Sequence, residues 1–139
     1  MASADLEFNH VMIYSRDVER SLRFYRDLLG FEAIDAWPPD YARLRSPAGR
    51  MTIALHAIGK DRRVNPKAEG IRLYFEVRDL DATCERLASE GVRFDQMPKD
   101  MEWGWRHAYL KDPDGHEVSL YWAGAKRLRK AQGPSGRSE

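Results

Sequence analysis

In residues 8–14, near the start of the chain, the apolar residues Val11 and Ile13 alternate with His10 and Met12. In an extended chain, Val11 and Ile13 point to one side, and His10 and Met12 point to the other. A period of two predicts a β-strand with one face toward the core and the other toward a cavity or a neighbouring sheet.

A helical pattern follows this strand. Asp17 suits the N-cap of a helix, because its carboxylate can accept hydrogen bonds from the free N–H groups of the first turn. Gly30 lies where a left-handed residue commonly ends a helix. We therefore predict a helix that runs to Leu29 and buries one apolar stripe. This stripe consists of Val18, Leu22, Tyr25 and Leu29.

Three short segments separated by turn-forming residues come next. Residues 37–40 contain two prolines, and residues 46–49 contain a proline and a glycine, as is typical of turns. The first half of the chain is therefore predicted to be a strand, a helix and three further strands. These three strands are expected at residues 31–36, 41–45 and 51–57.

The second half of the chain repeats this order. Asp79 lies 62 residues after Asp17 and suits the cap of a second helix, which ends at Gly91. Because the cap, the apolar stripe and the stop recur in the same order, the pattern indicates a duplication. The second stripe consists of Leu80, Cys84 and Leu87. Strands are predicted at residues 71–77, 92–95, 108–111 and 117–122, with a tight turn at 112–115.

Composition and charge narrow the classes of function. The 139 residues suit a single domain, which we place at residues 1–123 with modules at 6–58 and 70–123. The formal net charge of +1 favours neither nucleic acid nor an anionic membrane as a partner, and no apolar run could span a bilayer. With one cysteine and no leader-like start, a cytoplasmic protein is expected. Residues 124–139 are predicted to be a basic, disordered tail.

Two motifs resemble a known superfamily. Residues 10–17 and 21–31, which read HVMIYSRD and SLRFYRDLLGF, are similar to the opening of the vicinal oxygen chelate superfamily. Residues 109–121, which read YLKDPDGHEVSLY, resemble its closing strand. The resemblance covers about residues 6–123 and implies an α+β fold, in which two βαβββ modules form an open, curved barrel of mixed sheet. Members include glyoxalase I, dioxygenases and bleomycin-resistance proteins, so the resemblance implies no single activity.

The resemblance also implies metal-ligand positions on the first and last strand of each module. His10 matches the first of these positions, and the other three hold Ala54, Arg72 and Ser119. Arginine offers only hydrogen-bond donors, so it cannot coordinate a metal ion. Since a transition-metal site needs about three protein ligands, we favour no metal cofactor.

One alternative metal set remains. His56 lies two residues after Ala54, and Glu117 lies two residues before Ser119, so each shares the face of its strand. With His10 they would form the two-histidine, one-carboxylate set that suits non-haem iron. A divalent metal held by these three side chains is therefore the alternative cofactor, although a two-residue offset moves a Cα atom by about 6.6 Å.

The cavity of the predicted barrel suits an organic ligand better than a metal ion. Arg72 either pairs internally with Glu76 or Glu117 or grips an anionic group of a ligand. The loop tryptophans either clamp a flat ligand or plug an end of the barrel. The predicted ligand-binding residues are His10, His56, Arg72, Tyr74, Trp103, Trp105, Ser119 and Tyr121.

Three hypotheses about function follow. The first is a metal-independent protein that binds an aromatic or anionic small molecule, and a homodimer is the expected assembly. The second is an enzyme, either a metal-dependent lyase, isomerase or dioxygenase that uses the alternative metal set, or a metal-free enzyme with His10 or Glu76 as general base. The third is an interaction domain with a vestigial cavity. His107 and His116 are expected to face solvent or lie in turns, and Cys84 is expected in the core.

Overall fold

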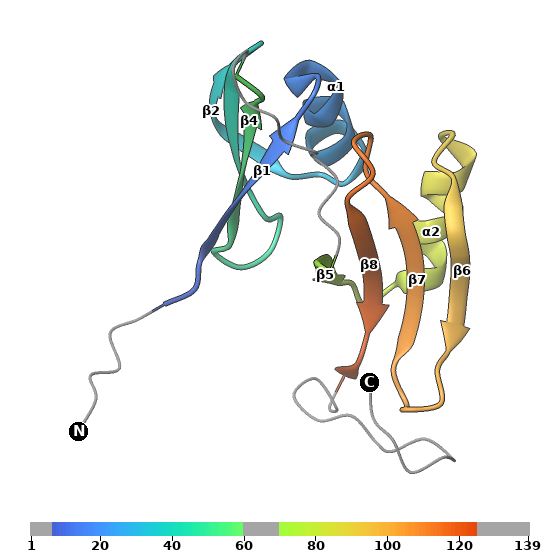
Figure 1. The fold of residues 1–139 in the computed structure, drawn as a ribbon. Helices are drawn as coiled ribbons and strands as arrows, with labels where there is room; N and C mark the ends of the chain where they lie inside the picture. The colour runs from blue at the N-terminus through green and yellow to red at the C-terminus, as the bar shows by residue number, and fades with distance from the viewer. Residues whose placement is uncertain (1–6, 60–69, 125–139) are drawn as a thin grey trace, which may run out of the picture. The chain divides into compact units, whose positions relative to one another are not determined.

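A computed structural model describes residues 7–59 and 70–124 of the chain. The chain divides into two compact units, Met1–Pro66 and Lys67–Glu139. Each unit contains one four-stranded mixed sheet and one helical segment, in the order strand, helix and three strands (Figure 1). This confirms the predicted α+β class and the repeated βαβββ order. Residues 60–69, between the two predicted modules, and residues 125–139 of the predicted tail lie outside the described residues.

In unit one the strands follow the order β1-β4-β3-β2, with β1 parallel to β4 and the other neighbours antiparallel. Strands β1 and β2 form the two edges, so the sheet of this unit is open. The elements of the unit are β1 (His10–Ser15), α1 (Val18–Leu22), the π-helix η1 (Arg23–Leu28), β2 (Glu32–Trp37), β3 (Tyr41–Arg45) and β4 (Thr52–Ala57).

The first helix begins and ends where predicted, with Gly30 at φ +84° after it, but its second half is a π-helix. Asp17 Oδ1 accepts a hydrogen bond of 3.1 Å from Arg20 N, which confirms the N-cap. From Arg23 the helix widens into a π-helix, in which Leu29 N donates to Phe24 O over five residues. The wider turn buries Phe24 and Tyr25, whereas Leu29 of the predicted stripe is only half-buried.

Unit two has the corresponding strand order, β5-β8-β7-β6, with β5 parallel to β8. Asp79 occupies the N-cap position of the second helix, but its side chain makes no capping hydrogen bond. Gly91 follows this helix at φ +96°, as expected of a left-handed stop. The elements are β5 (Arg72–Glu76), α2 (Leu80–Ser89), β6 (Phe94–Asp100), β7 (Arg106–Lys111) and β8 (Glu117–Trp122).

Two strands of unit two are longer than predicted. Strand β6 includes Met97 and Pro98, which were expected in a loop. Proline has no N–H group to donate, so it fits here because β6 is an edge strand whose pairing with β7 is irregular between Gln96 and Lys99. Strand β7 begins at Arg106 and therefore includes His107.

The two faces of each sheet differ in chemistry. In unit one, Leu44, Ile53 and Leu55 are buried on the face that packs against the helical segment. In unit two, α2 contributes Leu80, Cys84 and Leu87 to the core, which confirms the predicted stripe and the core position of Cys84. The opposite face of each sheet carries most of the candidate site residues.

Of the helices that the structure describes, none is both long and apolar enough to cross a membrane.

Candidate functional site

Two pairs of residues occupy equivalent positions in the two units. His10 begins β1 and is aligned with Thr52, the first residue of β4. Arg72 begins β5 and is aligned with Glu117, the first residue of β8. His10 and Arg72 are therefore structural equivalents, as the sequence repeat predicts.

In unit one, the hydroxyl of Thr52 connects three neighbours. Its Oγ1 lies 2.7 Å from Nδ1 of His10, 3.5 Å from a terminal guanidinium nitrogen of Arg43, and 3.3 Å from the carbonyl oxygen of Asn9. A hydroxyl has one hydrogen and two lone pairs. All three contacts are satisfied when Thr52 donates to Asn9 and accepts from Arg43 and from the Nδ1–H of His10. In that arrangement, the Nε2 atom of a neutral His10 keeps its lone pair.

The other predicted histidine of unit one lies further along the same face. His56 is aligned with Tyr14 on β1 and with Tyr41 on β3. Its ring centroid lies 6.0 Å from that of Tyr14 and 6.2 Å from that of Tyr41, both in edge-to-face geometry. Its Nδ1 lies 2.8 Å from the carbonyl oxygen of Ala57. His56 thus belongs to an aromatic group on this face.

The register does not bring His10 and His56 together. His10 is aligned with Thr52, four residues before His56 on β4. Four residues of strand correspond to about 13 Å. Because histidine nitrogens bind transition metals at about 2 Å, this separation does not suit two ligands of one ion.

In unit two, Arg72 is held within its own sheet. A terminal guanidinium nitrogen lies 3.3 Å from Glu117 Oε2, and the guanidinium carbon lies 4.4 Å from the ring centroid of Tyr109. Burial lowers the pKa of Arg72, but the hydrogen bond and the charge of Glu117 outweigh burial, and the pKa ends above its ordinary value. The contacts favour the internal ion pair over a grip on a ligand. The other predicted partner, Glu76, instead accepts from the backbone N–H groups of residues 123 and 124.

Ser119 is also engaged within unit two. Its Oγ lies 2.8 Å from Nδ1 of His107, and both side chains are fully buried. The expectation that His107 faces solvent or lies in a turn is therefore wrong. Its position two residues before Tyr109 could have indicated this, because alternate residues of a strand share a face.

The two loop tryptophans, predicted either to clamp a ligand or to plug an end of the barrel, are buried against other side chains of unit two. Trp103 and Trp105 lie in the loop between β6 and β7, and their exposed fractions are only 7% and 8%. The Trp105 ring stacks on Tyr121 at a centroid distance of 5.2 Å, and the Trp103 ring lies 5.5 Å from that of His107. Both tryptophans are thus part of the packing of unit two.

Tyr74 is the predicted ligand-binding residue of unit two that is most open to solvent, with an exposed fraction of 44%. Its ring lies 5.5 Å from Tyr121 and 5.7 Å from His107 in edge-to-face geometry. Tyr74 therefore forms the exposed edge of an aromatic cluster whose other members include His107 and Tyr121.

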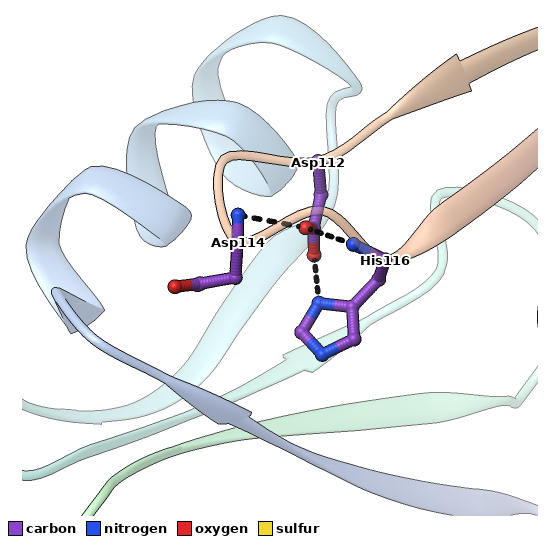
Figure 2. Close-up of side chains that lie close together, drawn as sticks. All are labelled: Asp112, Asp114 and His116. Atoms are coloured by element: carbon purple, nitrogen blue, oxygen red, sulfur yellow. Dashed lines mark hydrogen bonds and ion pairs between the residues drawn. The ribbon is translucent and has the colours of Figure 1, made fainter. Parts of the chain in front are cut away.

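The turn before β8 brings together Asp112, Asp114 and His116, all buried, with potential ligand atoms within 4.8 Å of one another. Asp112 Oδ1 accepts from the backbone N–H groups of both other residues, each at 2.9 Å, and Oδ2 lies 2.6 Å from His116 Nδ1. The carboxylate of Asp114 points away from the other two side chains (Figure 2). These contacts are those of a braced turn, and they confirm a turn position for His116 while excluding a solvent-facing one.

The implied metal positions do not suit a divalent ion. In unit one, Ala54 offers no ligand atom, and the Nδ1 atom of His10 is hydrogen-bonded to a threonine hydroxyl. In unit two, Arg72 is a cation held by Glu117, and Ser119 is hydrogen-bonded to a histidine. The chemistry of this donor set therefore disagrees with the metal-dependent pattern.

Comparison with known proteins finds a matching family model, related sequences and a similar solved structure. The family model described as Glyoxalase/Bleomycin resistance protein/Dioxygenase superfamily matches residues 7–120. The uncharacterized protein YaeR of Escherichia coli is 32% identical over 83% of this chain and 95% of its own length. A lactoylglutathione lyase of Pseudomonas putida is 29% identical over 86% of each chain. A crystal structure from Sphaerobacter thermophilus, described as a member of the same superfamily, is 28% identical with a TM-score of 0.69 and covers 84% of this chain and 98% of that chain.

Proposed function

Because the chain belongs to the Glyoxalase/Bleomycin resistance protein/Dioxygenase superfamily, we propose that it binds an aromatic or anionic organic molecule without a metal. The name of a superfamily that includes both enzymes and resistance proteins does not select between catalysis and binding. The choice rests on the side chains of this chain.

One observation carries the proposal: neither residue at the implied metal positions of unit two is a usual metal ligand, and both make contacts within the protein. Arg72 pairs with Glu117 and lies over the ring of Tyr109. Ser119 shares a hydrogen bond with His107. Without a metal ion, recognition of a ligand would rest on stacking and hydrogen bonds, which is the usual chemistry of small-molecule sites.

The remaining candidate residues supply such a surface. In unit one, His10 and His56 lie on one face of the sheet with tyrosines beside them. In unit two, Tyr74 and Tyr121 form aromatic contacts on the face that also carries Ser119. Aromatic rings offer large apolar area at fixed geometry, so they suit a flat organic ligand.

The proposal is tested on freshly purified full-length protein by elemental analysis and by a thermal-shift screen of aromatic and anionic compounds. We expect far less than one transition-metal ion per chain and stabilisation by at least one compound, since a ligand that binds only the folded state raises the melting temperature. One stoichiometric transition-metal ion per chain would overturn metal independence. A complete lack of stabilising compounds would favour the interaction-domain hypothesis.

A metal-dependent lyase, isomerase or dioxygenase remains the second candidate. Two observations favour it: several relatives are named lactoylglutathione lyase, and His10 keeps a residue type that can bind metal. This candidate requires that His10→Ala abolish both metal uptake and turnover. If the protein instead binds its ligand without a metal, His10→Ala should leave the measured metal content as low as that of wild type.

We further propose that the protein is a cytoplasmic homodimer with no nucleic-acid or membrane partner. The net charge of +1 offers no general attraction to polyanions. Within the described residues, each sheet ends in two edge strands, and a second copy would suit as a cover because exposed strand edges tend to pair. Sedimentation of the full chain tests the dimer, and a monomer at all concentrations would contradict it.

A further inference from the structure

Arg43 lies on the inner strand β3, on the sheet face that also carries His10 and Thr52. It belongs to no motif in the sequence that points to a site. We propose that Arg43, with Thr52 and His10 beside it, is the subsite that binds the carboxylate of an aromatic carboxylate ligand. This inference rests on the proposed function and narrows its ligand to one chemical class.

The position of the guanidinium group is the first support. A terminal nitrogen of Arg43 lies 3.5 Å from Thr52 Oγ1, and His10 Nδ1 lies 2.7 Å from the same oxygen. The nitrogen atoms of the two side chains are therefore no more than about 6 Å apart, roughly the combined reach of two hydrogen bonds. An arginine side chain thus reaches across the sheet to the start of β4, next to His10.

The charge of Arg43 is the second support. Asp35 is aligned with Arg43 on β2, yet its Oδ1 accepts from Trp37 Nε1 at 2.7 Å. Within residues 7–59 and 70–124, Arg43 forms no ion pair. Arg45, two residues further along the same face, is instead paired with Glu32. The cation at residue 43 is therefore available to an anion from solution.

Unit two provides an internal comparison. Glu117 occupies in that unit the position that Thr52 occupies in unit one. A guanidinium group reaches each of these positions, from Arg43 in one unit and from Arg72 in the other. In unit two a carboxylate of the protein itself neutralises the cation. In unit one a hydroxyl stands there, so the corresponding carboxylate is expected to come from the ligand.

The surroundings define the ligand class. Guanidinium groups suit the planar, two-oxygen geometry of a carboxylate. One cation, with the carboxylate of Asp35 on the next strand, suits a single negative charge better than the double charge of a phosphate. Tyr41 shares the face two residues before Arg43, and His56 lies beside it, so an aromatic body has rings to contact.

The test measures binding of matched acids and amides to the full-length protein by calorimetry. The probes are benzoate and naphthoate, each compared with its neutral carboxamide, and phenyl phosphate serves as the alternative anion. We expect the acids to bind at least about tenfold more tightly than the amides, because a charge-assisted hydrogen bond is lost with the charge. Arg43→Gln should remove this preference, and Arg45→Gln, on the same strand and face, should keep it.

The possible outcomes separate the two proposals. Amides that bind wild type as tightly as acids, a preference that survives in Arg43→Gln, or a preference for phenyl phosphate would overturn the carboxylate subsite. If other compounds of the thermal-shift screen still bind, the proposed binding function stands and only the carboxylate subsite is rejected. If neither the acids and amides nor any compound of the screen binds, the proposed function and the carboxylate subsite both fail. Arg43 is exposed, so its variant is expected to fold normally, and a melting curve like that of wild type verifies this.

Discussion

The Nδ1 atom of His107 lies 2.8 Å from the Oγ atom of Ser119, with neither side chain exposed to solvent. Ser119 stands where the family resemblance implies a metal-binding carboxylate. In this chain its hydroxyl instead serves an imidazole that is surrounded by the rings of Trp103, Trp105 and Tyr121. The position has thus become part of the internal packing of unit two.

Ser119→Ala should lower the free energy of unfolding by about 1–3 kcal/mol, because a buried hydrogen-bonding atom of His107 loses its hydroxyl partner. Urea unfolding of wild type and variant measures the difference. Ser89→Ala is a matched control, since the Ser89 hydroxyl makes its hydrogen bond at an exposed site, and we expect a change within about 0.5 kcal/mol. Equal losses of unfolding free energy in the two variants would show that the buried hydrogen bond stabilises the protein no more than the exposed one.

Local patterns were sufficient to predict the order of elements. Alternation and spacing identified the strands, and capping chemistry identified Asp17 as a helix start, because these signals act within a few neighbouring residues. The prediction was wrong where the local signal was ambiguous. The π-helix at Arg23–Leu28 changes which side chains are buried, and β6 continues through Pro98 because an edge strand tolerates proline.

The candidate site was harder to predict, because its contacts join residues of different strands. The proximity of Arg43 to His10 depends on the register of β3 and β1 against β4, which no short stretch of sequence determines. His107 was missed because the predicted strand began one residue too late to include it. The pairing of Arg72 with Glu117 was one of the stated alternatives, since a buried arginine needs an anionic partner and Glu117 was expected on the same side of the sheet.

Glu117→Gln should destabilise the protein by no more than about 1 kcal/mol, because the side chains of Arg72 and Glu117 keep exposed fractions of 33% and 38% and water screens the pair. A double-mutant cycle with Arg72→Met measures the coupling between them. We expect the contact with the Tyr109 ring to retain part of the stability that Arg72 provides. A coupling energy above about 3 kcal/mol would mean that the pair behaves as a fully buried ion pair.

Asp112→Ala should cost about 2–4 kcal/mol of unfolding free energy, since one carboxylate holds two backbone N–H groups and the ring of His116 in a buried turn. Asp95→Ala removes a carboxylate that pairs with Lys111 at an exposed site and should cost less than about 1 kcal/mol.

The melting temperature of wild type should not change with a chelator. A clear drop with the chelator, absent in the Asp112 variant, would show that the turn binds a metal.

Cys84 should be unreactive toward thiol reagents in the folded protein. Its side chain is fully buried on the stripe of α2, and burial raises the pKa of the thiol to about 11. The thiolate is the reactive form, so at pH 8 only about one molecule in a thousand carries it, far fewer than for a thiol with the ordinary pKa of 9.0. Modification should therefore become fast only when urea unfolds the chain, and rapid modification of the native protein at pH 8 would contradict the buried position.

The same raised pKa of Cys84 predicts how stability depends on pH. Between about pH 9 and pH 11 the thiol ionises in the unfolded chain but stays protonated in the folded one, so the unfolded state binds fewer protons and stability falls as pH rises. The loss should reach on the order of 2 kcal/mol by pH 11. Cys84→Ala lacks this thiol, so its deficit relative to wild type should shrink between pH 7 and pH 10.5 in urea unfolding. Other titrating groups affect both proteins alike, and a deficit that stays constant would mean that the thiol ionises equally easily in both states.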